Sequence, residues 1–167
     1  MLIRDEEKKD RESVRSVNQS AFETPSEANL VDLLREEAKP LVSLVAEQDG
    51  TVVGHIMFSP VSLSGHPNLQ LMGLAPMAVT PAHQRKGVGS ALVRTGLERA
   101  KQLGIAAVVV VGHPEYYPRF GFSPASRFGV TCIYEVPDDV FMAIELVPGA
   151  LTGRTGQVHY HAAFAGL

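Results

Sequence analysis

One short segment combines glycines and cations in a pattern that suits an anionic ligand. The segment is TPAHQRKGVGSAL, residues 80–92, and it stands between a short apolar run and a long helical pattern. Gly87 and Gly89 lack the Cβ that would keep a ligand away from backbone N–H groups at a helix start. Arg85 and Lys86 add cations beside the positive end of the helix dipole. The segment therefore predicts a phosphate or pyrophosphate site, against the alternative of an ordinary glycine-rich helix start with solvated cations.

Several other motifs that carry chemistry do not fit. A dinucleotide fingerprint would need a third glycine where Leu92 stands, and the Walker A pattern is absent. Ser90 is not in a G-x-S-x-G elbow, so we interpret it as a helix residue rather than a nucleophile. No metal site is expected, because the six histidines include no H-E-x-x-H pair and His159 and His161 lie in a glycine-rich tail. Cys132 has no identifiable activating partner and is expected to be a buried apolar residue.

Composition limits the classes of partner. The chain has 167 residues, 45% of them hydrophobic, which predicts one domain over residues 1–167. A net charge of −3 and an aromatic content of 7% argue against nucleic acid as a partner. One cysteine and the charged start MLIRDEEKKDRE predict a cytoplasmic protein. The longest apolar runs, around 71–79 and 105–111, are too short to cross a membrane, so no membrane partner is expected.

The start of the chain predicts two short amphipathic helices. Apolar residues recur at helical spacing over residues 10–22 and again over 26–38. Ser26 is the expected N-cap of the second helix. The polar hinge between the two helices is residues 23–25.

The next segment predicts three antiparallel strands. Asp49-Gly50 is a tight-turn dipeptide, so the apolar strands on either side of it, 41–48 and 51–63, should form a hairpin. A third strand, 69–80, follows a turn at 65–68. Pro76 cannot donate a hydrogen bond to a sheet, which predicts a bulge or a local separation from a neighbouring strand.

A strand–helix–strand unit follows the glycine-rich segment. Residues 84–103 have helical periodicity, and Gly104 is the expected end of the helix. Residues 105–111 are uniformly apolar, as in a strand covered on both faces, so a right-handed parallel crossover is predicted. Beyond it we expect a short helical turn closed by Gly121 and a strand around 140–147, whereas 149–167 has no clear period.

Two motifs and their order resemble the GCN5-related N-acetyltransferases (GNAT). Residues 84–89, QRKGVG, match the family's Q/R-x-x-G-x-G/A signature, and residues 117–122, YPRFGF, match its Tyr-x-x-x-Gly-Phe segment. A bulged strand, glycine turn, long helix, buried strand and tyrosine segment follow one another in the family's order. The resemblance implies an α+β fold in three layers, α/β/α. Its mixed, largely antiparallel central sheet would have a parallel β-α-β crossover at the ligand site.

The same resemblance implies acetyl-CoA as cosubstrate, with the pyrophosphate on the turn and the pantetheine along the third strand. The residues expected to contact it are Met77, Ala78, Val79, Gln84, Arg85, Lys86, Gly87, Val88, Gly89 and Ser90. The backbone N–H near Ala78 would stabilise the oxyanion. Tyr117 would be the general acid for the CoA sulfur, with Tyr116 as the competing candidate. The acceptor would be a primary amine of a small molecule or peptide, which attacks directly in a ternary complex.

This sequence departs from the family pattern at two places. Gly112-His113-Pro114 stands where an asparagine commonly contacts pantetheine. The strand 69–80 contains no Asp or Glu, so the general base stays open between Glu115, His55, Glu27, His113 and a water chain. A missing base favours less basic amines, because an α-amine has an ordinary pKa of roughly 7.7 to 8.0 and a lysine roughly 10.4.

The flanking regions receive expectations of their own. Residues 1–40 would supply acceptor-side helices, with Glu23 and Glu27 available to attract an ammonium group, and 69–123 would form the acetyl-CoA core. The tail, 149–167, has no predicted role, and a homodimer is compatible with the sequence. The rival function from another class is a non-catalytic acyl-CoA-binding or sensing module, which would keep the turn without the chemistry.

Overall fold

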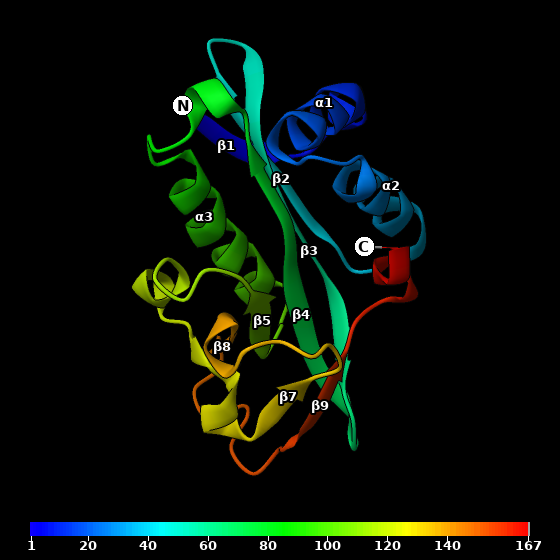
Figure 1. Ribbon diagram of the computed structural model, residues 1–167, viewed down its shortest axis with the longest axis vertical. Helices are drawn as coiled ribbons and strands as arrows, with labels where there is room; N and C mark the ends of the chain where they lie inside the picture. Colours follow the sequence, from blue (N-terminus) through cyan, green and yellow to red (C-terminus); the bar gives the residue numbers. More distant parts are fainter. Residues whose placement is uncertain (167) are drawn as a thin grey trace.

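A mixed β-sheet forms the middle layer of the molecule. The computed structural model describes residues 1–166. The strands of this part of the chain are β1 (Leu2–Asp5), β2 (Val42–Gln48), β3 (Thr51–Leu63), β4 (His66–Val79), β5 (Ala107–Val111), β6 (Ser123–Pro124), β7 (Val130–Cys132), β8 (Phe141–Glu145) and β9 (Gly156–His159). They pair in the order β1-β2-β3-β4-β5-β8-β6, and β9 joins the end of β3 to β7 (Figure 1). Among them, β4–β5 and β7–β9 pair in parallel and the other pairs are antiparallel.

Helices cover both faces of this sheet. The three α-helices of the described chain are α1 (Arg11–Ala21), α2 (Ser26–Glu37) and α3 (Val88–Gln102). Figure 1 shows α3 on one side of the sheet and α1 and α2 on the other, which confirms the three-layer α+β fold. Short 3-10 turns complete the chain: η1 (Lys8–Asp10), η2 (Pro81–His83), η3 (Tyr117–Phe120), η4 (Ala125–Phe128), η5 (Asp138–Val140) and η6 (Ala162–Gly166).

The N-terminal cap of α2 differs from the sequence prediction. Ser26 is the first helical residue, and Pro25 occupies the N-cap position. The Ser26 N-cap prediction was therefore wrong. Proline has no side-chain acceptor, and the Thr24 hydroxyl accepts a hydrogen bond from the Ser26 N–H at 3.4 Å instead.

The hairpin between β2 and β3 is confirmed. Asp49 and Gly50 have φ values of 52° and 79°, the left-handed backbone that a two-residue hairpin turn requires. The next turn is tighter than expected, because β4 already begins at His66 and the turn comprises Ser64 and Gly65.

The irregularity expected at Pro76 is present in β4. Ile56 of β3 pairs with Met77, but Phe58 pairs with Leu74, so one residue of β3 faces two residues of β4. On its other side β4 pairs with β5 only from Leu71 to Gly73. The later part of β4, from Leu74 to Val79, therefore has β3 on one edge and no strand on the other. This opening between β4 and β5 lies where the third strand was predicted to separate from a neighbour.

The parallel crossover through α3 is also confirmed, although the helix is shorter than predicted. It begins at Val88 rather than at Gln84, because Arg85 and Gly87 take left-handed φ values of 62° and 85° that interrupt a helix. Gly104, with a φ of 83°, ends it as expected. The strand after it is β5, whose residues from Ala107 to Val110 are almost completely buried.

The ends of the chain contain structure that the sequence did not predict. The charged start forms β1, which pairs with β2. The tail, in which the sequence has no clear period, contains β9, which pairs with Ser62 and Leu63 of β3. Cys132, expected to be buried, is only half-buried because β7 lies at the margin of the sheet. Leu167 lies outside the described residues.

Candidate functional site

The turn before α3 presents a row of backbone donors. Within the described chain, no backbone carbonyl accepts a hydrogen bond from the N–H groups of residues 85–90. The left-handed backbone at Arg85 and Gly87 aims successive N–H groups to one side, as in an anion-binding nest. The side-chain amide of Gln84 donates to the Val79 carbonyl at 2.9 Å and ties the turn to the end of β4. Such a row of N–H donors without backbone partners suits a phosphate-bearing ligand.

A cavity of about 400 Å³ lies over this turn. It is lined by Val79, His83, Gln84, Arg85, Gly87, Gly89, Ser90, Tyr116 and Arg119. Six of the predicted cofactor contacts are in this lining. Two others adjoin it differently: Lys86 is fully exposed on the turn, and Val88 points into the core beneath α3.

Three residues of the lining were not predicted as contacts. The imidazole Nδ1 of His83 lies 2.8 Å from the Thr80 hydroxyl. Arg119 donates from Nε to the Tyr116 carbonyl at 2.9 Å, and its guanidinium carbon lies 4.6 Å from the centre of the Tyr116 ring. Arg119 is therefore a third cation at the cavity, brought there by η3 from beyond β5. No local sequence pattern marks it, because it reaches the turn only through the fold.

The two remaining predicted contacts, Met77 and Ala78, lie with Val79 along the free edge of β4. Met77, Ala78 and Val79 all belong to the part of β4 that has no partner on the β5 side. The Met77 side chain packs against Gly89, where an added Cβ would lie 3.4 Å from the methionine methyl carbon. A ligand held by the turn therefore meets an open strand edge next to it, to which an extended chain can hydrogen-bond.

The two neighbouring tyrosines occupy different environments. Tyr117 is 7% exposed, packs edge-to-face on Phe122 at 5.6 Å, and lies so close to Gly112 that a Cβ there would be 2.4 Å from its ring. Burial raises the pKa of Tyr117 to about 12, so its hydroxyl keeps its proton at neutral pH. Tyr116 is half-buried, and its hydroxyl lies 3.1 Å from the Ser90 hydroxyl at the start of α3. Tyr117 thus adjoins the end of β5, and Tyr116 adjoins the turn.

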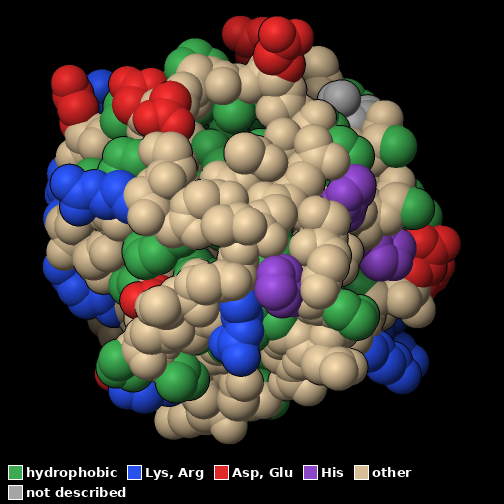
Figure 2. Space-filling view, turned by 90° about the horizontal axis from the view of Figure 1, so that it is seen from below, with side chains coloured by type: hydrophobic (Ala, Val, Ile, Leu, Met, Phe, Trp, Pro, Cys, Tyr) green, Lys and Arg blue, Asp and Glu red, His purple; other side chains and the backbone are tan. Residues whose placement is uncertain are grey.

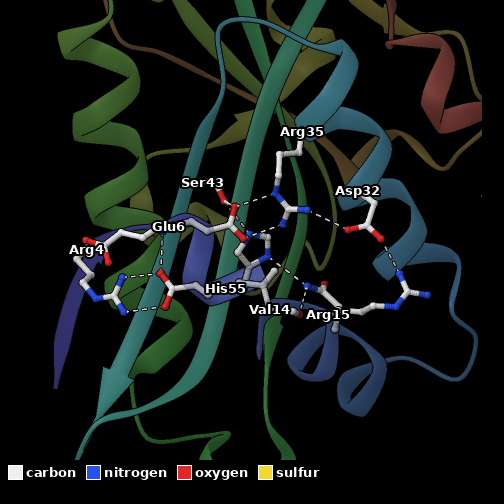
Figure 3. A network of polar contacts seen from close by, with 11 residues as sticks. Arg4, Glu6, Val14, Arg15, Asp32, Arg35, Ser43 and His55 are labelled. Carbon is white, nitrogen blue, oxygen red and sulfur yellow. Dashed lines mark hydrogen bonds and ion pairs between the residues drawn. The ribbon is translucent and has the colours of Figure 1, made fainter. Parts of the chain in front are cut away.

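Among the candidate bases, His55 is enclosed in the polar network of Figure 3. The Asn18 amide donates to its Nδ1 at 3.2 Å, so Nε2 carries the hydrogen and donates to the Ser43 hydroxyl at 3.0 Å. Ser43 donates in turn to Glu6, which is paired with Arg35 at 2.7 Å. Burial, reinforced by the Arg35 charge, lowers the pKa of His55 to about 3. Both ring nitrogens are engaged, which leaves neither free to take a proton from a substrate.

The other candidate bases lie at the surface or near α1. Glu115 and His113 are exposed in the loop after β5. Glu27, in the first turn of α2, is half-buried and has one carboxylate oxygen out of contact with water and without a hydrogen-bond partner in the described structure. Glu23 is exposed just before α2. None of these carboxylates lines the cavity over the turn.

Charged side chains also lie at the surface away from the cavity over the turn and from the polar network of Figure 3. At the end of the molecule seen in Figure 2, acidic, basic and histidine side chains are scattered over the face. Within residues 1–166, no three His, Cys, Asp or Glu side chains lie close enough together to hold a metal ion. No helix in this part of the chain combines the length and the apolar character needed to cross a membrane.

The chain belongs to the acetyltransferase (GNAT) family, whose sequence profile matches residues 7–122. It is 39% identical to an uncharacterized N-acetyltransferase, YhbS, of Escherichia coli strain K12, over 98% of both chains. The crystal structure of E. coli YhbS in complex with CoA superposes with a TM-score of 0.92 at 38% identity, covering 98% of this chain and 91% of that one. A GNAT family acetyltransferase from Brucella melitensis, in complex with acetyl-CoA, gives a TM-score of 0.81 at 36% identity, covering 98% and 97%.

Proposed function

We propose that this protein transfers the acetyl group of acetyl-CoA to a primary amine, by direct attack of the amine in a ternary complex. The proposal rests on one observation: two segments whose backbone groups lack hydrogen-bond partners lie next to each other. The turn from Arg85 to Ser90 offers free N–H donors beside two cations, and the neighbouring edge of β4 has no partner strand. The first surface suits a pyrophosphate and the second an extended amide chain, and CoA contains both in that order.

Different residues of this chain then bind the cosubstrate, stabilise the oxyanion and supply the proton. Arg85, Lys86 and Arg119 supply positive charge toward the phosphates. The backbone of Met77, Ala78 and Val79 binds pantetheine, and an N–H near Ala78 stabilises the oxyanion that develops on the acetyl carbonyl. The amine nitrogen forms a bond to the acetyl carbon, the carbon–sulfur bond breaks, and the thiolate takes the proton of the Tyr117 hydroxyl. The proton released by the amine passes to water or to a base, and the Tyr117 phenolate takes a proton back from water, which restores its hydroxyl.

Tyr117 has the spacing to Gly121-Phe122 that the family's tyrosine has, and its phenol is protonated at neutral pH, so it can donate a proton to the thiolate. Tyr116 is the competing candidate through its place at the turn. The test compares Tyr117→Phe with Tyr116→Phe, two variants that each remove one hydroxyl from the same short segment. We expect Tyr117→Phe to lower kcat by about 10² or more while the Kd for acetyl-CoA changes less than about twofold. We expect Tyr116→Phe to change kcat little. A larger kcat loss in Tyr116→Phe would transfer the role to Tyr116.

Calorimetric titration with acetyl-CoA separates transfer from the rival function, a non-catalytic acyl-CoA sensor. Binding together with release of free thiol in the presence of amines supports transfer, whereas binding without transfer to any amine supports the sensor. Gly89→Glu places a carboxylate at the turn, where an added Cβ already meets Tyr116 and Met77. It is expected to abolish binding under both functions, and normal binding by this variant in folded form would refute the assignment of the turn.

A further inference from the structure

A second cavity, of about 360 Å³, lies at the opening between β4 and β5. It shares no lining residue with the cavity over the turn. Leu74 and Ala75 line it from β4, at the first positions where β4 has lost β5 as a partner, and Val111 lines it from the end of β5. The remaining walls include three aromatic side chains, Tyr134, Tyr160 and Phe164. The volume suits a small molecule rather than a protein segment.

This cavity opens on the face of the sheet away from α3. Phe164 belongs to the apolar cluster that α1 and α2 cover, and Ala75 and Tyr160 pack against that cluster. Figure 1 shows the C-terminal turn, η6, on the α2 side of the sheet. The Tyr160 ring lies over Gly73, where an added Cβ would be 3.0 Å from it, and Gly73 is the last residue of β4 that pairs with β5. The aromatic wall therefore stands at the point where the two strands part, on the far side from the turn.

The side chains that line this cavity are all uncharged. Among the described residues that line the cavity there is no Lys, Arg, His, Asp or Glu. The Tyr160 ring lies 5.5 Å from Tyr134 and 5.2 Å from Phe164, and burial raises the pKa of its hydroxyl. A charged substituent placed among these side chains would lose its hydration without gaining a partner, whereas an aliphatic or aromatic one would gain contacts.

We infer that this cavity binds the body of the acceptor, and that the acceptor is a small primary amine whose substituent is an uncharged aliphatic or aromatic group. The inference rests on the proposed acetyl transfer and names its substrate class. An apolar site disfavours the ammonium form and lowers the pKa of a bound amine, so part of the acceptor reaches the reaction in its nucleophilic, neutral form. This agrees with the lack of any carboxylate on β4. Tyr134, Tyr160 and Phe164 all lie beyond residue 122, outside the region that matches the family profile.

The test uses three five-carbon amines that differ only at the end remote from one amino group: pentylamine, 5-aminopentanoate and cadaverine. Their termini are a methyl group, a carboxylate and an ammonium. With saturating acetyl-CoA we expect kcat/KM for pentylamine to exceed both others by about tenfold or more, because the cavity offers no partner to a charge. The aromatic amine 2-phenylethylamine should be at least as good a substrate as pentylamine.

Three variants locate the effect. Tyr160→Ala should raise KM for 2-phenylethylamine by about tenfold while the Kd for acetyl-CoA stays unchanged. Val111→Glu, at a position 44% exposed and so tolerant of charge, should shift the preference toward cadaverine by about tenfold relative to pentylamine. Ile133→Ala is the matched control, because Ile133 neighbours Tyr134 and is 46% exposed but does not line the cavity. It should leave all these constants unchanged.

Saturation-transfer NMR with 2-phenylethylamine gives a readout that does not need turnover. A signal lost in Tyr160→Ala and kept in Ile133→Ala supports the cavity as the binding site even if no amine is acetylated, and in that case the proposed transfer alone fails. If 5-aminopentanoate or cadaverine is the best substrate and Val111→Glu does not alter the ranking, the acceptor class is wrong although transfer stands. Absence of both binding and acetylation of the apolar amines also overturns the inference.

Discussion

Arg119 illustrates a site residue that depends on the fold rather than on a motif. Its sequence context, a cation inside YPRFGF, suggests only the tyrosine segment, yet η3 carries it to the cavity over the turn. Stacking on Tyr116 and a hydrogen bond to the Tyr116 carbonyl orient its guanidinium. An oriented cation beside a phosphate site contributes to affinity more than a solvated one does.

The first prediction at this scale concerns that cation. Arg119→Ala should weaken acetyl-CoA binding by about tenfold, and the loss should be larger at low salt because it is partly electrostatic. Arg94→Ala is the matched control, since it removes the same charge from an exposed position on α3 where the guanidinium stacks on Phe120 outside the cavity. Calorimetry at two salt concentrations measures both variants. If acetyl-CoA binding weakens equally in the two variants, Arg119 contributes only through the net charge of the protein.

At the scale of residues, motif matching found the turn and its glycines, and it favoured Tyr117 over Tyr116. Spacing to Gly121-Phe122 singled out Tyr117, and the structure gives each tyrosine a distinct neighbour, Gly112 for Tyr117 and Ser90 for Tyr116. His55 was a candidate base only because its surroundings are invisible in sequence. Its hydrogen-bond partners, Asn18 and Ser43, come from α1 and β2, and Glu6, which accepts from Ser43, follows β1; the three are far apart along the chain.

The packing of α3 on β3 depends on one glycine. A Cβ at Gly96 would lie 2.2 Å from the ring of Phe58, and both residues are completely or almost completely buried. Because α3 begins at the turn and crosses β3 at this point, the contact fixes how the turn is held against the sheet.

The prediction at the element scale follows from that contact. Gly96→Ala should destabilise the protein by about 1 to 3 kcal/mol despite the better helix propensity of alanine, because the ring of Phe58 has to move. Denaturant unfolding measures the free energy. Glu98→Ala, an exposed substitution on the same helix, should stay within about 0.5 kcal/mol of the wild type. A neutral Gly96→Ala would mean that α3 shifts freely on the sheet.

Elements with local signals were predictable and those without them were not. The Asp49-Gly50 hairpin, the irregularity at Pro76 and the helix that ends at Gly104 each carry their own turn or breaker residue. β9 has only four residues in a glycine-rich tail, and it is a strand because β3 and β7 lie on either side of it. β1 is half-exposed and charged, so its sequence resembles a solvated terminus. Such strands are specified by partners distant in sequence.

On the scale of the whole molecule, a polar network joins the N-terminal segment to α1, α2 and the sheet (Figure 3). Arg4 holds Asp10 at 2.7 Å, and this hydrogen-bonded pair lowers the pKa of Asp10 to about 2. Arg35 of α2 pairs with Glu6, and Ser43 links Glu6 to His55. Because His55 is buried, these hydrogen bonds require its ring to be neutral.

The pH dependence of stability follows from the lowered pKa of His55. The unfolded chain binds a proton at the ordinary pKa of about 6.5, whereas the folded chain resists it down to about 3. The stabilisation by neutral His55 is thus complete above pH 6.5 and declines as the pH falls toward 3, by at most about 1.4 kcal/mol per pH unit. Asp10 adds to acid sensitivity only at lower pH, as its carboxylate becomes protonated below its ordinary pKa of 3.8 and toward 2.

Urea unfolding between pH 7 and pH 4 tests this dependence. His55→Gln cannot ionise and should flatten the stability profile over that interval, even if its absolute stability is lower. His113→Gln, at an exposed loop position, is the control and should follow the wild-type profile. An unchanged slope in His55→Gln would show that other groups cause the loss of stability in acid.

The C-terminal segment that supplies Tyr160 and Phe164 lies outside the residues that match the family profile, so the two parts of the chain can evolve separately. The residues proposed to hold acetyl-CoA lie within residues 7–122, which match the family profile, whereas the aromatic side chains of the proposed acceptor cavity lie after them. A recombination that exchanged only the 3′ end of the gene would then carry a new acceptor preference onto an unaltered donor site. Duplicated copies of such a gene can diverge in acceptor while their cosubstrate site stays the same.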